Sequence, residues 1–347
     1  MNAARLRQFT ARYPRLRIAV VGDYCLDRYL EIDPALAETS IETGLPVHNV
    51  VRVRSQPGGA GTILNNLAAL GIGTILPIGF SGDDGEGFEL RRALAALPGV
   101  DTRSFQTTCE RRTFTYCKPL LIEPGSEPRE LNRLDTKNRT PTPGEVEAAL
   151  VQAIDAVADS VDALILLDQV DRPETGVVTA AVRTAVGALQ RRRPELLILA
   201  DSRRGLGDFP PTAFKMNVAE LARLQGTDRA IEEASIDAVA GAAAGLARRT
   251  GRAVFVTLAE RGIVGAPPDA AAEAVPAYPT RGPIDVVGAG DAVTSNLTAA
   301  LAAGAAPGEA LRTAMAAASI VVHQLGTTGT ADVAQIETLL RTAASPR

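Results

Sequence analysis

Short apolar runs alternate along the chain with longer amphipathic segments that are rich in alanine. β-Branched residues and leucine dominate these runs, which is typical of strands buried on both faces. Strands are predicted at residues 17–22, 74–80, 163–168, 196–201, 213–217 and 253–258. Because most of the runs are followed by enough residues for a helix or a crossover, the pattern predicts a mainly parallel sheet covered by helices.

Helices are predicted from amphipathic periodicity and from the lengths of the segments between the strands. They are predicted at residues 61–70, 85–97, 289–303, 307–324 and 331–344. The last part of the chain is therefore mostly helical, whereas strands and helices alternate in the part before it.

Two segments break this alternation, because residues 28–56 and 101–135 are polar and rich in threonine and arginine. Their short alternating stretches, such as VHNVVRVR and RRTFTYCK, predict antiparallel strands with one solvated face. A small sheet made from two insertions would project from the rest of the molecule as a lid. The predicted core comprises residues 1–27, 57–100 and 136–347, and the predicted lid comprises the two insertions.

The composition narrows the classes of function. Of the 347 residues, 46% are apolar and 22% are charged, as in ordinary globular proteins, and the formal charge of −4 argues against nucleic-acid or anionic-membrane partners. No run of about 18 apolar residues and no apolar leader core is present, so we expect a cytoplasmic protein. Three cysteines and two histidines lack metal-ligand spacing, which argues against a disulfide framework and a zinc site.

The segment DVVGAGDAV, residues 285–293, precedes an apolar helical run. Gly288, Ala289 and Gly290 are small, so their N–H groups can converge on an anion where the helix dipole favours negative charge. Asp291 follows in the first turn. An anion hole beside a carboxylate base suits phosphoryl transfer to an alcohol, because the base takes the hydroxyl proton. Taken alone, the segment fits an ordinary helix start equally well.

Three other segments also contain candidate chemistry. GDYCLDRY places Asp23 and Asp27 just beyond the carboxyl end of the first strand, where ligands bind in open α/β sheets. These carboxylates suit two sugar hydroxyls, and a solvated loop explains them as well. PGGAGTILNN opens a helix with Gly58 and Gly59, and GFSGDDGEG turns from strand to helix. No G-x-G-x-x-G or P-loop lysine is present in them, which argues against a dehydrogenase.

These four motifs occur in the order typical of one family. Over residues 17–330 the chain resembles the ribokinase-like (pfkB) sugar kinases, which share the acidic first-strand turn, the Gly-Gly helix, G-x-x-G-D-D-x-x-G and D-x-x-G-A-G-D. The resemblance implies a three-layer α/β/α core with a mostly parallel sheet and a small β-sheet lid. It also implies an ATP-dependent carbohydrate kinase that uses Mg²⁺, with K⁺ as a monovalent cation.

The resemblance also assigns roles to individual residues. Asp291 is the catalytic base, the amides of Gly288, Ala289 and Gly290 form the anion hole, and Asp285 helps to form the monovalent-cation site. The acceptor sugar is assigned to Asp23, Asp27, Gly58, Gly59, Glu42 and Arg203. The nucleotide is assigned to Asn217, Glu220, Thr257, Gly262, His323 and Gly326, with the run from His323 to Gly329 expected to close over the adenine.

Within the family, the chain looks most like the kinase domain of the bifunctional heptose enzyme. GDYCLDRY, the lid segment S-x-E-x-x-x-P-V that contains Glu42, and NRLD at residues 132–135 support this likeness. Two lysine-bearing segments of that branch are replaced here by LDQVDRP, with Asp171 at a lysine position, and by DSRRG, with Arg203. The acceptor therefore stays open between a heptose phosphate, a free sugar and a nucleoside.

Three further expectations concern catalytic activity, the oligomeric state and the domains that the chain contains. Thr62 and Met315 stand where the family usually has asparagine, which leaves a catalytically idle sugar or nucleotide sensor as the alternative function. Lid sheets of this family often pair between subunits, which implies a homodimer through the lid. Because no second α/β domain for nucleotidyl transfer follows the kinase motifs, we expect at most the kinase half of the bifunctional enzyme.

Overall fold

The strand β1 (Arg17–Gly22) shows why the apolar runs form the centre of the molecule. Its residues Ile18 and Val20 face one hydrophobic cluster, whereas Ala19 and Val21 face a second cluster on the opposite side. All four side chains are fully buried. A strand with two covered faces requires helices on both sides of its sheet, as the sequence pattern predicts.

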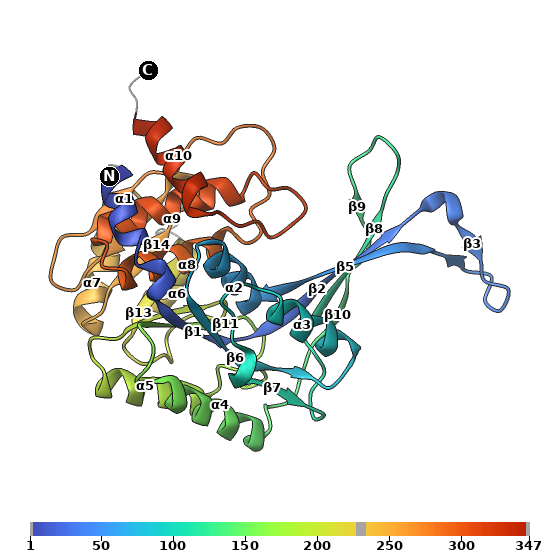
Figure 1. Cartoon of the computed structure of the whole chain (residues 1–347), viewed down its shortest axis with the longest axis horizontal. Coiled ribbons are helices and arrows are strands. Elements are labelled where there is room, and N and C mark those ends of the chain that lie inside the picture. Colours follow the sequence, from blue (N-terminus) through green and yellow to red (C-terminus); the bar gives the residue numbers. More distant parts are fainter. Residues whose placement is uncertain (1–2, 227–233, 345–347) are drawn as a thin grey trace.

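The computed structural model describes residues 3–226 and 234–344, and a nine-stranded sheet lies at its centre (Figure 1). The strand order is β16-β15-β14-β13-β12-β11-β1-β6-β7, and only β15 and β16 run antiparallel to their neighbours. The remaining strands are β6 (Thr74–Gly82), β7 (Phe105–Thr108), β11 (Ala163–Asp168), β12 (Leu197–Ser202), β13 (Ala213–Asn217), β14 (Val254–Thr257), β15 (Ile263–Ala266) and β16 (Glu273–Val275). The order reverses between β1 and β11, so a ligand crevice is expected at their carboxyl ends.

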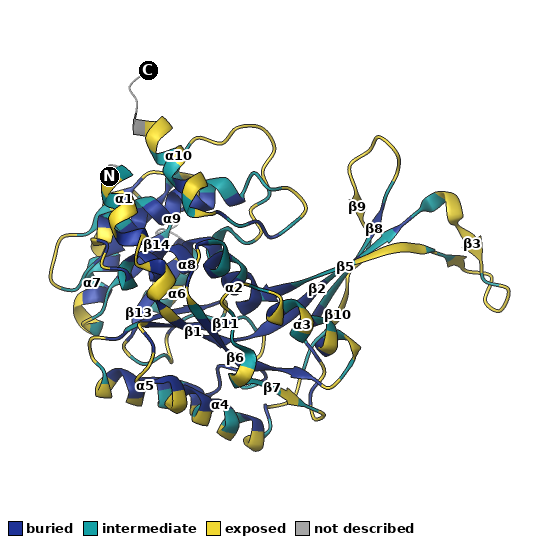
Figure 2. Ribbon diagram, viewed as in Figure 1, coloured by how far each residue is buried: buried dark blue, intermediate teal, exposed yellow. Residues whose placement is uncertain are grey.

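Helices cover both faces of the sheet and complete the three layers. One layer contains α4 (Gly144–Val157), α5 (Ala180–Arg192), α6 (Val218–Gln225) and α7 (Ile236–Thr250). The other contains α1 (Ala3–Thr10), α2 (Ala60–Ala69), α3 (Gly85–Ala95), α8 (Ala289–Ala302), α9 (Pro307–Val321) and α10 (Val333–Ala344). Figure 2 shows the amphipathic pattern directly, because α4 and α5 turn exposed residues outward and buried residues toward the sheet.

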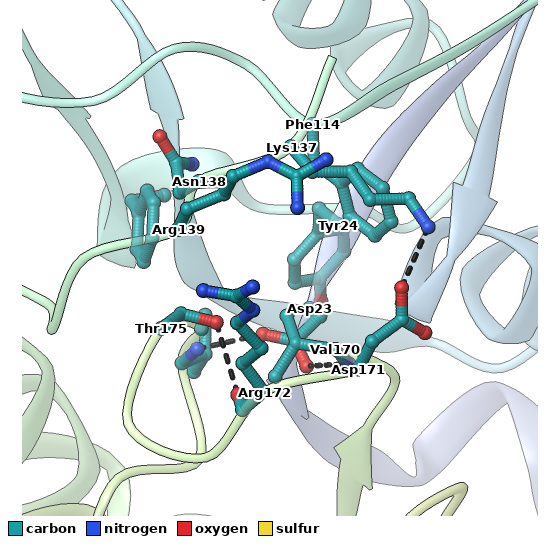
Figure 3. A pocket seen from close by; sticks show the side chains of 13 residues that line it. Asp23, Tyr24, Phe114, Lys137, Asn138, Arg139, Val170, Asp171, Arg172 and Thr175 are labelled. Carbon is teal, nitrogen blue, oxygen red and sulfur yellow. Dashed lines mark hydrogen bonds and ion pairs between the residues drawn. The ribbon is translucent and has the colours of Figure 1, made fainter. Parts of the chain in front are cut away.

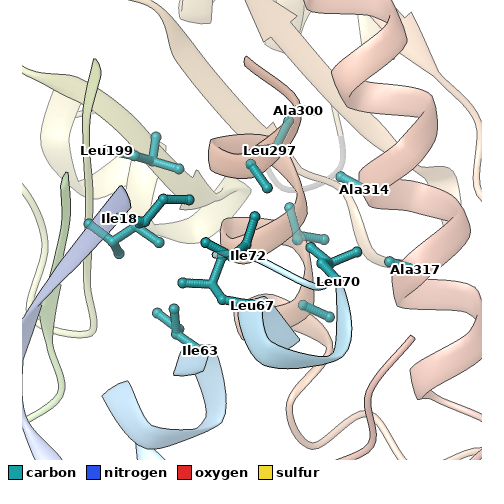
Figure 4. Close-up of a cluster of buried hydrophobic side chains, with 14 of the residues drawn as sticks. Ile18, Ile63, Leu67, Leu70, Ile72, Leu199, Leu297, Ala300, Ala314 and Ala317 are labelled. Carbon is teal, nitrogen blue, oxygen red and sulfur yellow. The ribbon is translucent and has the colours of Figure 1, made fainter. Parts of the chain in front are cut away.

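The packing of α8 fixes the part of the molecule that contains the DVVGAGDAV motif. Leu297 and Ala300 of α8 lie in one buried cluster with Leu67 of α2, Ala314 of α9 and Ile18 of β1 (Figure 4). Alanines line both sides of the contact between α8 and α9, so the two helices approach closely. The first turn of α8 is thereby held against the carboxyl edge of the sheet.

A second sheet projects from this core, as Figure 1 shows. Its strands are β2 (Tyr24–Ile32), β5 (Val50–Gly59), β8 (Thr115–Leu121), β9 (Arg129–Glu130) and β10 (Leu134–Thr136), and its outer end includes β3 (Glu38–Thr39) and β4 (Pro46–Val47). The prediction of antiparallel pairing is correct for β2 with β5 but wrong for β2 with β8, which pair in parallel. Both β2 and β8 run outward from the core, so their directions agree.

The structure also shifts three of the predicted boundaries between core and lid. β7 lies within residues 101–135 but pairs with β6 in the large sheet. β2 begins at Tyr24, within predicted core residues 1–27, and β5 continues to Gly59. The lid strands are therefore continuous with the core, which explains why composition alone misplaces the borders. Within residues 3–226 and 234–344, no helix combines the length and the apolar character that a bilayer span requires.

Candidate active site

Asp23 lies where the chain passes from β1 into β2, and its carboxylate binds the backbone of the segment that follows β11. Its Oδ2 accepts hydrogen bonds from the N–H groups of Gln169 at 2.7 Å and Val170 at 3.3 Å, and its Oδ1 accepts one from Val177 at 2.6 Å. Burial and the nearby Asp168 raise the pKa of Asp23 to about 7, against these amide donors. Predicted as a sugar ligand, Asp23 is occupied in holding this segment in place.

A small pocket of about 60 Å³ lies beside Asp23, between that segment and the base of the lid (Figure 3). Lys137 Nζ lies 2.6 Å from Asp171 Oδ2 at its rim, and Arg203 Nη1 lies 4.0 Å from Asp171 Oδ1. Asp171, predicted to stand at a lysine position of the heptose-enzyme branch, therefore lies between two cations.

Asp27 lies on β2 and is 6% exposed. Its Oδ1 is 3.5 Å from Lys118 Nζ of the neighbouring strand β8. Burial raises the pKa of Asp27, whereas the charge of Lys118 lowers it. A Cβ atom on Gly58 would lie 2.6 Å from Asp27 Oδ2 and 2.8 Å from Cys25 Sγ, so glycine at this position leaves the space in front of the carboxylate open.

Two residues assigned to the acceptor contribute differently. Gly59 has a φ of +58°, and a Cβ there would contact the carbonyl oxygen of Asp23, so glycine allows the sharp turn from β5 into α2. Glu42 lies at the outer end of the lid, exposed, with its Oε2 3.0 Å from Ser40 Oγ. The structure does not bring Glu42 to the crevice of its own chain.

The residues predicted to form the anion hole lie at the start of α8, where the Ala289 N–H also donates to the Val286 carbonyl oxygen at 3.2 Å. Gly288 adopts a φ of +83° as the N-cap, a left-handed conformation that favours glycine, and the following amides of Ala289 and Gly290 open the helix. Asp291 lies beside them in the same turn. Burial and the charge of Asp201 raise the pKa of Asp291 to about 7, against the charges of Lys215 and Arg203.

Lys215 and Asp201 belong to the same group of charges, and the sequence motifs did not identify them. Lys215 Nζ on β13 lies 2.8 Å from Asp201 Oδ2 at the end of β12, and Thr294 Oγ1 of α8 is 3.1 Å from the same oxygen. The available signal was a charged residue inside or at the end of a buried apolar run, in AFKMN and LLILAD. Such a buried charge requires a partner and often marks a functional site.

A cavity of about 970 Å³ opens on the other side of this turn. Four residues that the sequence singled out line it, namely Asn217, Thr257, Gly262 and Met315, together with Ala289 and Gly290 of the anion hole. Gly262 has a φ of +108°, and a Cβ there would contact the carbonyl oxygen of Val275. The cavity is lined mostly by apolar and small residues, as nucleotide and other small-molecule sites usually are.

The N-x-x-E motif forms a capping box at the start of α6. Asn217 Oδ1 accepts a hydrogen bond from the Glu220 N–H at 2.9 Å, and Glu220 Oε2 accepts one from the Asn217 N–H at 2.8 Å. Burial raises the pKa of Glu220, and the Asn217 N–H lowers it. The capping box fixes a half-buried carboxylate near the cavity, and within the described part of the chain Glu220 Oε1 has no hydrogen bond.

His323 and Gly326 do not line the cavity as described. Both nitrogens of His323 are bound: Nδ1 lies 2.6 Å from the Ser319 carbonyl oxygen, and Nε2 accepts the Arg281 N–H at 2.9 Å. The run expected to close over the adenine instead reaches the lid, where Gln56 Nε2 donates to Thr328 Oγ1 at 2.9 Å. His323 therefore supports the wall of the cavity from behind.

Asp285 precedes the anion-hole turn. Its Oδ1 accepts a hydrogen bond from the Val287 N–H at 3.0 Å, and its own N–H donates to the Val322 carbonyl oxygen at 2.8 Å. The structure thus joins Asp285 both to the residue after α9 and to the turn at Val287.

A helix N-terminus and a carboxylate lie between a large cavity and the pocket at the base of the lid, an arrangement that suits a phosphotransferase. The chain belongs to the pfkB family of carbohydrate kinases, because the model of that family matches residues 17–334. The predicted family and class of enzyme are thereby confirmed.

Curated relatives share this region. The bifunctional protein HldE of Gluconacetobacter diazotrophicus is 30% identical over 330 residues, which cover 93% of this chain and 63% of the relative. HldE of Bradyrhizobium sp. is 32% identical over 319 residues, which cover 90% and 61%. The chain thus spans less than two thirds of the length of these relatives.

Solved structures share the fold. The ribokinase of Arabidopsis thaliana, complexed with ribose and ATP, superposes with a TM-score of 0.65 at 19% identity and covers 94% of this chain and 99% of its own. Phosphofructokinase-2 of Escherichia coli, in complex with substrates and products, gives a TM-score of 0.72 at 18% identity, with 95% and 100% covered. The predicted α/β fold with a small separate sheet is thereby confirmed.

The open space in front of Asp27 gives the first testable prediction. Gly58→Ala places a methyl group against the Asp27 carboxylate and is expected to lower kcat/KM for the acceptor by about 10- to 100-fold, the effect of losing a hydrogen bond to a charged group. The KM for ATP should change little. Steady-state kinetics with each substrate varied measures both values. Gly144→Ala is the matched control, since no atom lies within 4 Å of the added Cβ, and equal effects of both variants would contradict the prediction.

Proposed function

We propose that this kinase transfers the γ-phosphoryl group of ATP to a hydroxyl group of a sugar, with Asp291 as the general base. One observation supports this most directly: Asp291 lies in the first turn of α8, between the 970 Å³ cavity and the side of the crevice that contains Asp27. The use of ATP, a cytoplasmic nucleotide, supports a cytoplasmic enzyme.

In the proposed reaction, Asp27 accepts a hydrogen bond from a sugar hydroxyl and orients the acceptor. Asp291 takes the proton of the reacting hydroxyl as its oxygen bonds to the γ-phosphorus, and the bond from phosphorus to the β,γ-bridging oxygen breaks, so that ADP leaves. The amides at Gly288, Ala289 and Gly290 stabilise the charge on the transferring group. Closure of the lid over the acceptor excludes water that would otherwise take the phosphoryl group.

The nucleotide is proposed to occupy the large cavity, against Thr257, Gly262 and the backbone around Asn217. In residues 3–226 and 234–344, no group of three or more His, Cys, Asp or Glu forms a metal cage. Mg²⁺ in phosphotransferases is held by one or two carboxylates together with substrate phosphates, and the free oxygen of Glu220 fits that pattern through water. When bound, Mg²⁺ neutralises phosphate charge. Asp285 is proposed to help hold K⁺ beside the turn.

The acceptor is proposed to be a sugar that already carries a phosphate, of the heptose type. Tyr116 lies next to Asp27 across the β2–β8 pairing, and three cations converge on it. The Arg133 guanidinium lies 4.6 Å and Lys137 Nζ 5.6 Å from the centre of its ring, and Arg203 bonds to its hydroxyl. A dianionic phosphate requires such cations, and a free sugar or a nucleoside does not.

Removal of the base tests the proposed reaction. Asp291→Asn is expected to lower kcat by roughly 10²- to 10⁴-fold, because the reacting hydroxyl loses its proton acceptor. Since the carboxylate is the active form and the pKa of Asp291 is raised to about 7, wild-type kcat/KM should fall as the pH decreases through about 7. A coupled ADP-release assay across pH measures both effects. Asp155→Asn, on the exposed face of α4, is the control and should keep the wild-type kcat. An active Asp291→Asn enzyme would disprove the mechanism.

A screen of acceptors tests the substrate class. Phosphorylated and free sugars, with a nucleoside included, are offered with ATP and Mg²⁺ in the presence and absence of K⁺, and ADP release is followed. We expect turnover with a sugar phosphate, and Arg133→Gln should raise its KM by about tenfold through loss of one charged contact. Preference for an unphosphorylated acceptor would contradict the proposed class but not the kinase activity. Tight binding without ADP release would instead favour a sensor.

A homodimer through the lid is proposed as the assembly. β5 is the edge strand of the lid sheet, and Val50, Val51 and Val53 on it are about half exposed, which leaves an unprotected apolar edge. We expect sedimentation to show a dimer that Val51→Lys and Val53→Glu together convert to a monomer. Arg191→Gln on α5 should leave the dimer intact, and a monomeric wild-type protein would refute the assembly.

A further inference from the structure

The most unusual charge in the molecule is the ammonium group of Lys215. Its side chain comes from the centre of the sheet, on β13, and is only 7% exposed. Lysine is rarely buried to this extent unless a charged or hydrogen-bonding partner compensates its ammonium group. Burial lowers the pKa of Lys215, but the charge and the hydrogen bond of Asp201, with Asp291 and Glu220 further away, outweigh it and raise the pKa above its ordinary value. The group is therefore an ammonium ion at neutral pH.

The hydrogen bonds of Lys215 are incomplete. An ammonium group has three N–H donors. In the part of the chain that the structure describes, Nζ has one hydrogen-bond partner, Asp201 Oδ2 at 2.8 Å. That oxygen also lies 3.1 Å from Thr294 Oγ1, which fixes the carboxylate against α8. Among residues 3–226 and 234–344, no acceptor binds the remaining donors of Lys215, so they are available to a ligand.

The position of Lys215 Nζ indicates which ligand its remaining N–H groups can reach. A Cβ atom added to Gly290 would lie 3.2 Å from Lys215 Nζ, and this is the nearest atom that such a Cβ would meet. Nζ thus lies close to Gly290, in the first turn of α8, whose N–H groups are proposed to form the anion hole. The charge of Lys215 also acts on Asp291, whose pKa it lowers. A cation with free donors, beside converging amides and the base, suits oxygens that gain negative charge.

We propose that Lys215 is a catalytic residue that donates hydrogen bonds to the non-bridging oxygens of the transferring γ-phosphoryl group. This inference rests on the proposed function and adds a contact that the sequence motifs do not contain. The lysine stays protonated throughout and breaks no bond, since it stabilises charge while Asp291 takes the proton. Asp201 holds Lys215 in place and compensates its charge before the nucleotide binds.

Nucleotide binding tests this role without any acceptor sugar. Lys215→Met is expected to weaken binding of a non-hydrolysable ATP analogue by roughly 10- to 100-fold, the effect of losing a charged hydrogen bond, with little change for ADP. Isothermal titration calorimetry with Mg²⁺ measures both affinities. Because Asp201 is left unpaired in that variant and folding can suffer, Lys215→Met/Asp201→Asn removes both charges at nearly constant volume. Arg193→Met, which removes a cation bound to Ala158 and Val161 carbonyls at the opposite edge of the sheet, is the matched control.

The outcomes separate the inference from the function on which it rests. Selective loss of analogue affinity in the double variant supports the inference, and a kcat lowered by about 10²- to 10³-fold agrees with it. In the single variant Lys215→Met, which keeps Asp201, the midpoint of the pH profile of kcat/KM should also move above its wild-type position, because Asp291 loses a neighbouring positive charge. A double variant that binds analogue and ADP as the wild type does shows that the pair is only structural, and overturns the inference. A wild type that binds neither nucleotide overturns the proposed function itself.

Discussion

The close packing of α8 against its neighbours is the constraint on which the rest of the site depends. Leu297 and Ala300 anchor the helix in the core, and alanines on α9 allow the two helices to approach closely. A helix held so firmly cannot shift its first turn without opening the core, where even small voids are costly. The amides of the turn and the Asp291 carboxylate are therefore placed in advance of any ligand, which is what preorganised charge stabilisation requires.

The buried charges beneath that turn follow from the same geometry. β12 and β13 end at the carboxyl edge of the sheet, and their polar residues Asp201 and Lys215 meet α8 there. Each of these charges alone would be costly in a buried position, but as a pair they compensate each other. The raised pKa of Asp291 has the same origin, because the carboxylate sits where water is scarce and a second carboxylate is near. The same small group of side chains therefore pairs the buried charges and shifts the pKa of Asp291.

Much of the fold was predictable from the sequence because its signals are local and strong. The strand at β1 and the strand at β11 were predicted with their observed bounds, since unbroken apolar runs are the clearest pattern in the chain. The lid was harder to predict, because pairing direction depends on where each strand leaves the core. The parallel pairing of β2 with β8 and the inclusion of β7 in the large sheet are properties of the path through space. No window of residues contains that information.

The site was predictable to the extent that its chemistry lies in contiguous motifs. The turn at Gly288 and the capping box of Asn217 with Glu220 each form within a few residues, so the resemblance to the pfkB family's contiguous motifs identifies them. Lys215 and Asp201 lie on different strands, and only the folded sheet brings them together. The hydrogen bonds of the Asp23 carboxylate to backbone N–H groups such as that of Val177 could not be predicted either. Their donors lie far from Asp23 in the sequence.

Gln56 of β5 connects the lid to the loop that packs against Gly288 at the start of α8. It exchanges hydrogen bonds with Thr327 and Thr328, and Thr328 packs against Gly288. Any movement of β5 away from this loop must either move Thr327 and Thr328 with it or break both hydrogen bonds of Gln56. If the turn at Gly288 binds phosphate as proposed, phosphate binding and the position of β5 that keeps both bonds favour each other by reciprocity. The proposed sugar and nucleotide would then be coupled thermodynamically without direct contact between them.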